Sequence, residues 1–365
     1  AVVKNGKIVY NESFGYKDLE TKTPLTNEDV MRIASISKSF TATSLLQLVD
    51  KGILSLDDDV SDLIGFKISN PHHPDIPITL KMVLSHTASI RDKEDYFTLD
   101  HLNPAIYGDC VESYFEYKPG EGYNYSNMGL NLAGTILEKV SGVRFDDYVR
   151  ENVIHKLGLY GGHNIDSLDA NKFALLYNFR DGAYVESKGA YKSRSEDMPN
   201  YVFGYSSPIF SPTGGVKISA HDLAIYMMMH MNYGEYNGIR IISEESSKIM
   251  QTPVWMIQNK GEEQYALCLK EFVDFIGRAL GAFFLFVALM VVSCDKVPSE
   301  GDEVADPDPI TGYVNLSASS TANSYIINQG GSYRISAVRG NDASNMLQTA
   351  RTAEVLWESF GSSLS

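Results

Sequence analysis

The stretch Ala34-Ser35-Ile36-Ser37-Lys38-Ser39-Phe40 sets the interpretation of this chain. It opens an apolar-periodic segment over residues 40–49, and Gly52 follows the last apolar position, which predicts a helix with a glycine stop. If the helix begins near Ser35, then Ser35 and Lys38 share one face, because they are three residues apart. The Ser35 oxygen would lie at the positive end of the helix dipole, where developing negative charge is favoured.

This spacing has a chemical interpretation and a purely structural one. A serine becomes a nucleophile beside a base, and a lysine amine can be that base only when it is uncharged. Burial can lower a lysine pKa enough for this, so Ser-x-x-Lys at a helix start predicts a nucleophile with its activator. A chain of ordinary composition holds about one or two such pairs by chance, however. The alternative is a helix start in which Ser35 is the cap and Lys38 is solvated.

Composition sets broad limits on the function. The chain has 365 residues, enough for one large or two ordinary domains, and 44% are hydrophobic, which supports a packed core. A formal net charge of −15 argues against a nucleic-acid partner. The three cysteines are too few and too scattered for a disulfide framework or a zinc site. No signal peptide is visible at the first residues, so we expect the start to be trimmed or partial.

A second candidate segment follows the turn at Pro119-Gly120. It contains Tyr125-Ser126-Asn127 and precedes an apolar helix pattern over residues 130–140. His86 is a weaker candidate for a general base, because a packed or capping histidine explains its position equally well. The adjacent His72 and His73 lack a third ligand at a useful spacing, so we expect a solvated loop there and no metal site.

The character of the chain changes near residue 270. Residues 279–292 form an apolar run that is short for a membrane span, and the ending at Cys294 resembles a lipoprotein lipobox. A buried helix is an equal alternative to membrane association through residues 279–294. We therefore expect a main domain over residues 1–269, a signal-like or helical segment over residues 270–296, and an acidic linker with a β-rich tail over residues 297–365.

Residues 1–269 resemble the superfamily of serine β-lactamases and penicillin-binding proteins, and are most similar to class C β-lactamases, D-alanyl-D-alanine carboxypeptidases and related esterases. The resemblance depends on Ser35-Ile36-Ser37-Lys38 and on Tyr125-Ser126-Asn127, which are the only Ser-x-x-Lys and the only Tyr-x-Asn within residues 1–269. Further similar segments are Leu54-Ser55-Leu56-Asp57-Asp58, Leu84-Ser85-His86-Thr87 and Gly214-Gly215 with Ala220-His221-Asp222-Leu223.

The resemblance implies a role for each motif residue. Ser35 would attack a carbonyl and form an acyl-enzyme, and Lys38 would help to take its proton. Tyr125 would be a general base or proton relay, because a phenol near an ammonium ionises more easily. Asn127 would bind a substrate amide and hold Lys38 in place. The partner would be a small molecule or peptide with a carbonyl, no metal or cofactor is needed, and the location would be the periplasm or cell envelope.

The implied fold is α/β (α+β), with an antiparallel sheet built from the N-terminal hairpin and C-terminal strands, flanked by helices and carrying an inserted mainly helical region. The chain departs from the pattern at the third motif, Lys/His-x-Gly on an edge strand, because no such triplet occurs from Val216 onward. We therefore expect a C-terminally incomplete serine hydrolase acting on an amide or ester. Two alternatives stay open, namely a weakly active peptidoglycan- or peptide-binding relative and a lipid-anchored surface protein.

Overall fold

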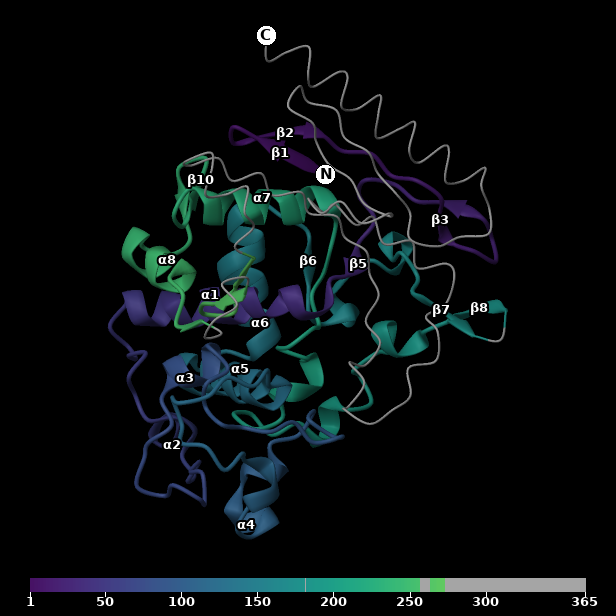
Figure 1. The fold of residues 1–365 in the computed structure, drawn as a ribbon. Coiled ribbons are helices and arrows are strands. Elements are labelled where there is room, and N and C mark those ends of the chain that lie inside the picture. Colours follow the sequence, from purple (N-terminus) through teal and green to yellow (C-terminus); the bar gives the residue numbers. More distant parts are fainter. Residues whose placement is uncertain (181, 257–262, 273–365) are drawn as a thin grey trace, which may run out of the picture. The chain divides into compact units, whose positions relative to one another are not determined.

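The strand that precedes helix α1 belongs to a small three-stranded antiparallel sheet (Figure 1). The computed structural model describes residues 1–180, 182–256 and 263–272. The strands β5 (Met31–Arg32), β9 (Lys217–Ile218) and β6 (Gly161–Gly162) form one sheet in the order β5-β9-β6. Because β5 is held at one edge of this sheet, the next residues and α1 (Ser37–Asp50) start from a defined place.

Helix α1 forms the centre of the hydrophobic core. Phe40 on this helix stacks on Tyr226 of α7 (Ala220–Met231), with 3.8 Å between the ring centroids. The buried Tyr226 hydroxyl lies 3.0 Å from Thr43 Oγ1 and donates to Ser39 Oγ at 3.2 Å. These polar side chains on α1 thus have hydrogen-bond partners inside the core. Such partners are needed when a helix is buried on nearly all sides.

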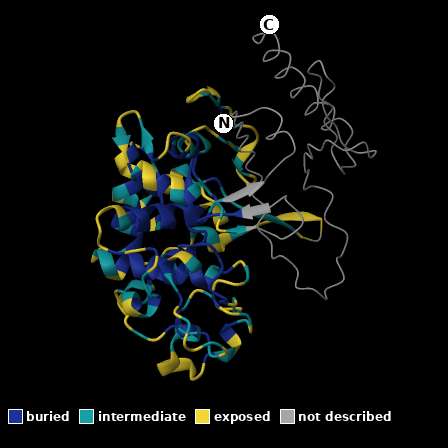
Figure 2. Ribbon diagram, turned by 60° about the vertical axis from the view of Figure 1, so that its left-hand side comes forward, coloured by how far each residue is buried: buried dark blue, intermediate teal, exposed yellow. Residues whose placement is uncertain are grey.

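The inserted helical region predicted between the strands is confirmed. It contains α2 (Val60–Ile64), α3 (Leu80–Leu84), α4 (Pro104–Tyr107) and α5 (Asn127–Ser141). Figure 1 shows these helices on one side of α1 and α7 on the other. Helix α5 contacts α1, α2 and α3, while α6 (Phe145–Val149) and α8 (Glu244–Gln251) also contact α1. Figure 2 shows the buried residues running through this helical block.

The N-terminal hairpin is confirmed, but its place in the sheet differs from the prediction. Strands β1 (Val2–Lys4) and β2 (Lys7–Tyr10) flank Asn5 and Gly6, whose φ angles of 51° and 68° suit a type I′ turn. The hairpin packs on α7 through Val3 and Met228. The predicted single sheet is wrong among the described residues, because the hairpin forms a two-stranded sheet of its own and the C-terminal strands pair with one another.

Those C-terminal strands are β12 (Trp255–Met256), β13 (Glu263–Tyr265) and β14 (Lys270–Phe272), paired antiparallel in that order. The structure is therefore a mixed α/β fold with small antiparallel sheets, as the fold class predicted. The other two-stranded pairs are β3 (Tyr16–Asp18) with β4 (Thr23–Pro24), β7 (Tyr177–Arg180) with β8 (Ala183–Glu186), and β10 (Glu235–Tyr236) with β11 (Ile239–Arg240).

Several predictions concern residues outside those described. They are the apolar run over residues 279–292, Cys294, the acidic linker, the β-rich tail and the domain limits beyond residue 272. Within the part of the chain that the structure describes, none of the helices has the length and apolar character needed to cross a bilayer.

Candidate active site

Ser35 lies on a strained turn directly before α1. The predicted helix start near Ser35 is wrong in detail, because residues Ala34–Ile36 form a 3₁₀ turn and the α-helix begins at Ser37. Ala34 has a φ of 46°, a left-handed value that a residue with a Cβ adopts at a cost of about 1–3 kcal/mol. The Val216 amide donates to Ser37 Oγ at 3.0 Å and so anchors the turn. This turn leaves Ser35 exposed.

Lys38 is buried beneath Ser35, with only 1% of its surface exposed. Its Nζ donates to Ser35 Oγ at 3.1 Å, to Asn127 Oδ1 at 2.9 Å and to the Thr213 carbonyl at 3.0 Å. Three acceptors match the three N–H groups of an ammonium. In the uncharged amine, one of these positions becomes a lone pair, and the Ser35 hydroxyl is correctly placed to donate its proton to it. The alternative of a solvated Lys38 is therefore excluded by its burial.

Tyr125 lies beside this pair, but its electrostatics differ from the prediction. Lys38 Nζ is 4.6 Å from the centroid of the Tyr125 ring, a cation–π contact. Burial raises the pKa of Tyr125 above its ordinary value, and a hydrogen bond with Ser35 only partly offsets this. The expectation of an easily ionised phenol is wrong for this geometry. Tyr125 is a neutral phenol at neutral pH, which suits a proton relay better than a resident base.

Asn127 is held by a carboxylate that the sequence did not single out. Asp92 Oδ2 accepts from the Asn127 backbone N–H and from Asn127 Nδ2, both at 2.9 Å. Asp92 Oδ1 accepts from Ser126 Oγ at 2.9 Å and from the Met128 N–H at 2.8 Å. The carboxylate therefore occupies the N-terminus of α5, where the helix dipole favours it. It also orients the Asn127 amide so that Oδ1 points to Lys38.

His86 is a packed histidine, the interpretation that the sequence favoured. Its side chain is 2% exposed, and Nδ1 accepts from the Ser126 N–H at 3.1 Å. Burial, together with the Lys38 charge, lowers the pKa of His86 to about 3. The ring packs against Tyr125 and Tyr265, with 4.5 and 4.9 Å between centroids. His86 therefore stays neutral and packs against the Tyr125 ring, and so low a pKa makes it a poor proton acceptor.

The segment after β13 closes this side of the site as far as the structure describes it. The Leu267 amide donates to the Met250 carbonyl at 3.2 Å, and the Cys268 amide donates to the Leu84 carbonyl at 3.0 Å. Tyr265 packs near Tyr123, with 5.1 Å between the ring centroids. Residues 263–269 thus belong to the same compact unit as Ser35.

The structure brings together all four predicted residues, Ser35, Lys38, Tyr125 and Asn127. Sequence analysis missed Asp92 and the Thr213 carbonyl. Asp92 is an ordinary acidic residue in an aperiodic stretch 35 positions before Asn127, and a backbone acceptor has no side-chain signal at all. The segment Gly214-Gly215, which resembles the family, was the only sequence signal next to Thr213.

The family model described as beta-lactamase matches residues 1–261, and the chain belongs to this family of serine hydrolases. Among curated proteins, it is 32% identical over 198 residues to penicillin-binding protein 4* of Bacillus subtilis, covering 50% of this chain and 42% of that protein. It is 33% identical over 164 residues to protein flp of Staphylococcus aureus, covering 43% of this chain and 32% of that protein. The chain therefore spans less than half the length of these relatives.

Solved structures agree with this assignment. The octameric penicillin-binding protein homologue from Pyrococcus abyssi is 27% identical with a TM-score of 0.60, and the match covers 76% of this chain and 61% of that one. The hydrolase EstCE1, which has promiscuous acyltransferase activity, has the same TM-score of 0.60 at 18% identity, with 77% of this chain and 79% of that chain covered. The latter likeness supports the fold alone.

Proposed function

We propose that this chain is a serine hydrolase domain that cleaves an amide or an ester, of the β-lactam, D-alanyl-peptide or simple ester type, through an acyl-Ser35 intermediate. The observation that carries the proposal is the contact of Lys38 Nζ with Ser35 Oγ at 3.1 Å and with Asn127 Oδ1 at 2.9 Å. A buried amine beside an exposed hydroxyl on a strained turn is an arrangement suited to covalent catalysis.

The proposed first step forms one bond and transfers one proton. Ser35 Oγ attacks the substrate carbonyl carbon while its proton passes to the uncharged Lys38 amine, directly or through the Tyr125 hydroxyl. The tetrahedral intermediate then collapses, the bond to the leaving amine or alcohol breaks, and the leaving group takes that proton. In the second step, water attacks the carbonyl carbon of the acyl-Ser35 ester and gives one proton to the Lys38 amine. The bond between that carbon and Ser35 Oγ then breaks, Ser35 Oγ takes the proton back, and the acid is released. Asn127 would bind the substrate amide and keep Lys38 in position between the steps.

We further propose that turnover by this chain is weak. The missing Lys/His-x-Gly triplet would have supplied a cleft wall and the second oxyanion donor. Loss of one such donor lowers the rate by about 10²–10³. If the acyl-Ser35 ester forms but is hydrolysed very slowly, the chain would behave as a binder of peptidoglycan-like peptides. The absence of the third motif favours this alternative function. Rapid steady-state hydrolysis of nitrocefin or a p-nitrophenyl ester would contradict the proposal of weak turnover.

The test of the serine-hydrolase proposal is covalent labelling. A fluorescent penicillin and a fluorophosphonate should label the wild-type chain, and peptide mapping should place the label on Ser35. The variant Ser35→Ala should lose the label, while Ser195→Ala, a substitution of another exposed serine, should keep it. Labelling that persists in Ser35→Ala, or that maps to another residue, would refute the proposal.

A membrane location is a separate proposal that depends on residues 279–294 alone. The apolar run and Cys294 support lipid attachment in the cell envelope or periplasm. Metabolic palmitate labelling of the full chain should be lost in Cys294→Ser. Equal labelling of both chains would contradict the proposal.

A further inference from the structure

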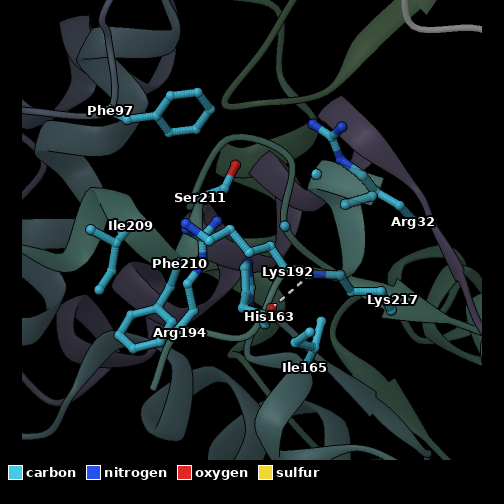
Figure 3. Close-up of a pocket in the computed structure, with 13 residues that line it drawn as sticks. Arg32, Phe97, His163, Ile165, Lys192, Arg194, Ile209, Phe210, Ser211 and Lys217 are labelled. Carbon is cyan, nitrogen blue, oxygen red and sulfur yellow. Dashed lines mark hydrogen bonds between the residues drawn. The ribbon is translucent and has the colours of Figure 1, made fainter. Parts of the chain in front are cut away.

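A second polar pocket lies on the far side of the loop that contacts Lys38. The loop over residues 211–215 presents the Thr213 carbonyl to Lys38, while the Gly214 carbonyl accepts from Arg32 Nε at 2.9 Å. Arg32 also lines a cavity of about 100 Å³ (Figure 3). One water needs roughly 10–15 Å³ of such space, so the cavity has room for a small polyatomic ion.

The lining of this pocket carries a charge opposite to that of the chain. Four of its side chains are basic, and no aspartate or glutamate belongs to the lining, although the whole chain has a net charge of −15. The basic residues are Arg32, Lys192, Arg194 and Lys217. Arg194 is paired with Asp197 at 3.3 Å, but within the described residues no ion pair is formed by Arg32, Lys192 or Lys217. The pocket therefore concentrates positive charge.

The strand register places two of these cations directly opposite each other. Arg32 on β5 is the cross-strand partner of Lys217 on β9, so both side chains lie on one face of the sheet. Like charges in this position destabilise a sheet unless an anion lies between them.

Lys217 is buried without a compensating carboxylate. Its side chain is 6% exposed, and its Nζ donates to the His163 carbonyl at 2.9 Å, a contact visible in Figure 3. Burial, together with the charges of Arg32 and Arg194, lowers the pKa of Lys217 to about 7, and Asp166 acts weakly in the opposite direction. A buried ammonium is costly unless a counter-charge is close. A bound anion would provide one.

The buried side chain of His163 is a second, independent indication that this pocket binds a ligand. It lines the same pocket and is 3% exposed, yet neither ring nitrogen has a hydrogen-bond partner within the described residues. Burial and the Lys217 charge lower the pKa of His163 to about 3, so the ring is neutral and keeps one N–H donor. Buried polar atoms without partners are uncommon in folded proteins.

We propose that the pocket between β5, β9 and residues 189–194 is a binding site for a small oxyanion, either a carboxylate or a sulfate- or phosphate-like group. Arg32 and Lys217 would bind it from the sheet, and Lys192 and Arg194 would bind it from the opposite wall. The site is separate from Ser35, but it shares the loop over residues 211–215 with it. Occupation would therefore stabilise the loop carbonyl that accepts from Lys38. This inference does not depend on acyl transfer.

Sulfate is the probe for the test, because its charge is constant between about pH 6 and pH 8.5, a range that includes the lowered pKa of Lys217, about 7. Thermal unfolding of the full chain would be followed while sulfate replaces chloride at constant ionic strength. We expect a rise in Tm that saturates, with binding at least tenfold weaker at the higher pH. The control is Lys248→Met, which removes an exposed lysine paired with Glu244 on α8 and should leave saturable binding unchanged.

Lys217→Met should abolish the saturable part of the shift and leave only the linear stabilisation that sulfate gives to any protein. If this variant does not fold, Lys192→Gln and Arg194→Gln address the same pocket from nearer the surface, and each should weaken sulfate binding several-fold. A linear shift that is identical in the wild-type chain, Lys192→Gln, Arg194→Gln and Lys248→Met would overturn the proposal.

The source of the anion is distinguished by competition in the Ser35→Ala variant. Displacement of sulfate by benzylpenicillin at concentrations where acetate has no effect would support a substrate carboxylate as the ligand. Equal displacement by acetate and benzylpenicillin would support a free small anion. Saturable sulfate binding in a chain that no penicillin labels would support this site while the proposed hydrolase function fails, so the two proposals can be separated.

Discussion

Replacing Asp92 by asparagine tests how the active site is held together. The Asp92 carboxylate accepts four hydrogen bonds at 2.8–2.9 Å, from Ser126 Oγ, the Asn127 and Met128 amides, and Asn127 Nδ2. Asparagine has nearly the same shape but only one acceptor oxygen. Two of the four donors would therefore face an NH₂ group instead of an oxygen.

The expected loss of stability follows from the number of hydrogen bonds that Asp92 accepts. A hydrogen bond to a charged group contributes about 1.5–3 kcal/mol, and a carboxylate at a helix N-terminus adds about 0.3–1 kcal/mol. Because bonds in one network are not additive, we expect Asp92→Asn to lower the free energy of unfolding by about 3–5 kcal/mol. The Asn127 amide would also lose its orientation toward Lys38. Misplacement of a positioning group by about 1 Å costs up to about 10²-fold in rate.

Two measurements check this prediction. Urea unfolding gives the change in stability, and the second-order rate of labelling by a fluorescent penicillin gives the change in acylation, which we expect to fall tenfold to a hundredfold or so. Asp95→Asn is the matched control, because Asp95 is exposed and lies three residues further along the same segment. An Asp92→Asn chain that unfolds within about 0.5 kcal/mol of wild type and labels at the same rate would refute the reasoning.

Three further predictions address other parts of the structure. Tyr125→Phe keeps the ring over the lysine but removes the hydroxyl, so labelling should slow by about 10²–10⁴ while urea unfolding changes little; an unchanged rate would exclude the relay role. Gly134→Ala should lower stability by about 1–3 kcal/mol, since its Cβ would lie 2.4 Å from Pro212 Cγ; an unchanged urea midpoint would show that the loop can move. Three buried histidines have pKa values lowered to about 3, 3 and 4, below the unfolded value of 6.5. Their stabilisation is complete above about pH 6.5 and is lost as the pH falls toward 4, by up to about 1.4 kcal/mol per histidine and pH unit; a flat urea-unfolding profile over this range would contradict it. The three are His86, His163 and His230.

Local sequence signals predicted most of the elements that surround the site. The N-terminal hairpin with its Asn5-Gly6 turn and the glycine stop at Gly52 both occur as expected, because each depends on the conformational preference of one or two residues. The helix start at Ser35 was predicted two residues too early. The strain at Ala34 comes from the sheet that holds Ile33, whose amide donates to the Val216 carbonyl at 3.0 Å, and no local propensity encodes a contact between such distant residues.

By itself, the sequence determined which side chains could perform acyl transfer, because Ser35 and Lys38 are neighbours on the chain and Tyr125 and Asn127 form a single recognisable motif. It did not determine their electrostatics. Burial decided that the Tyr125 phenol stays protonated and that His86 is neutral, and burial depends on the packing of segments distant in sequence. Tertiary structure alone also decided the role of Asp92 and the cross-strand position of Arg32 opposite Lys217. The reason is that the function of a single aspartate or lysine depends on which groups the fold places beside it.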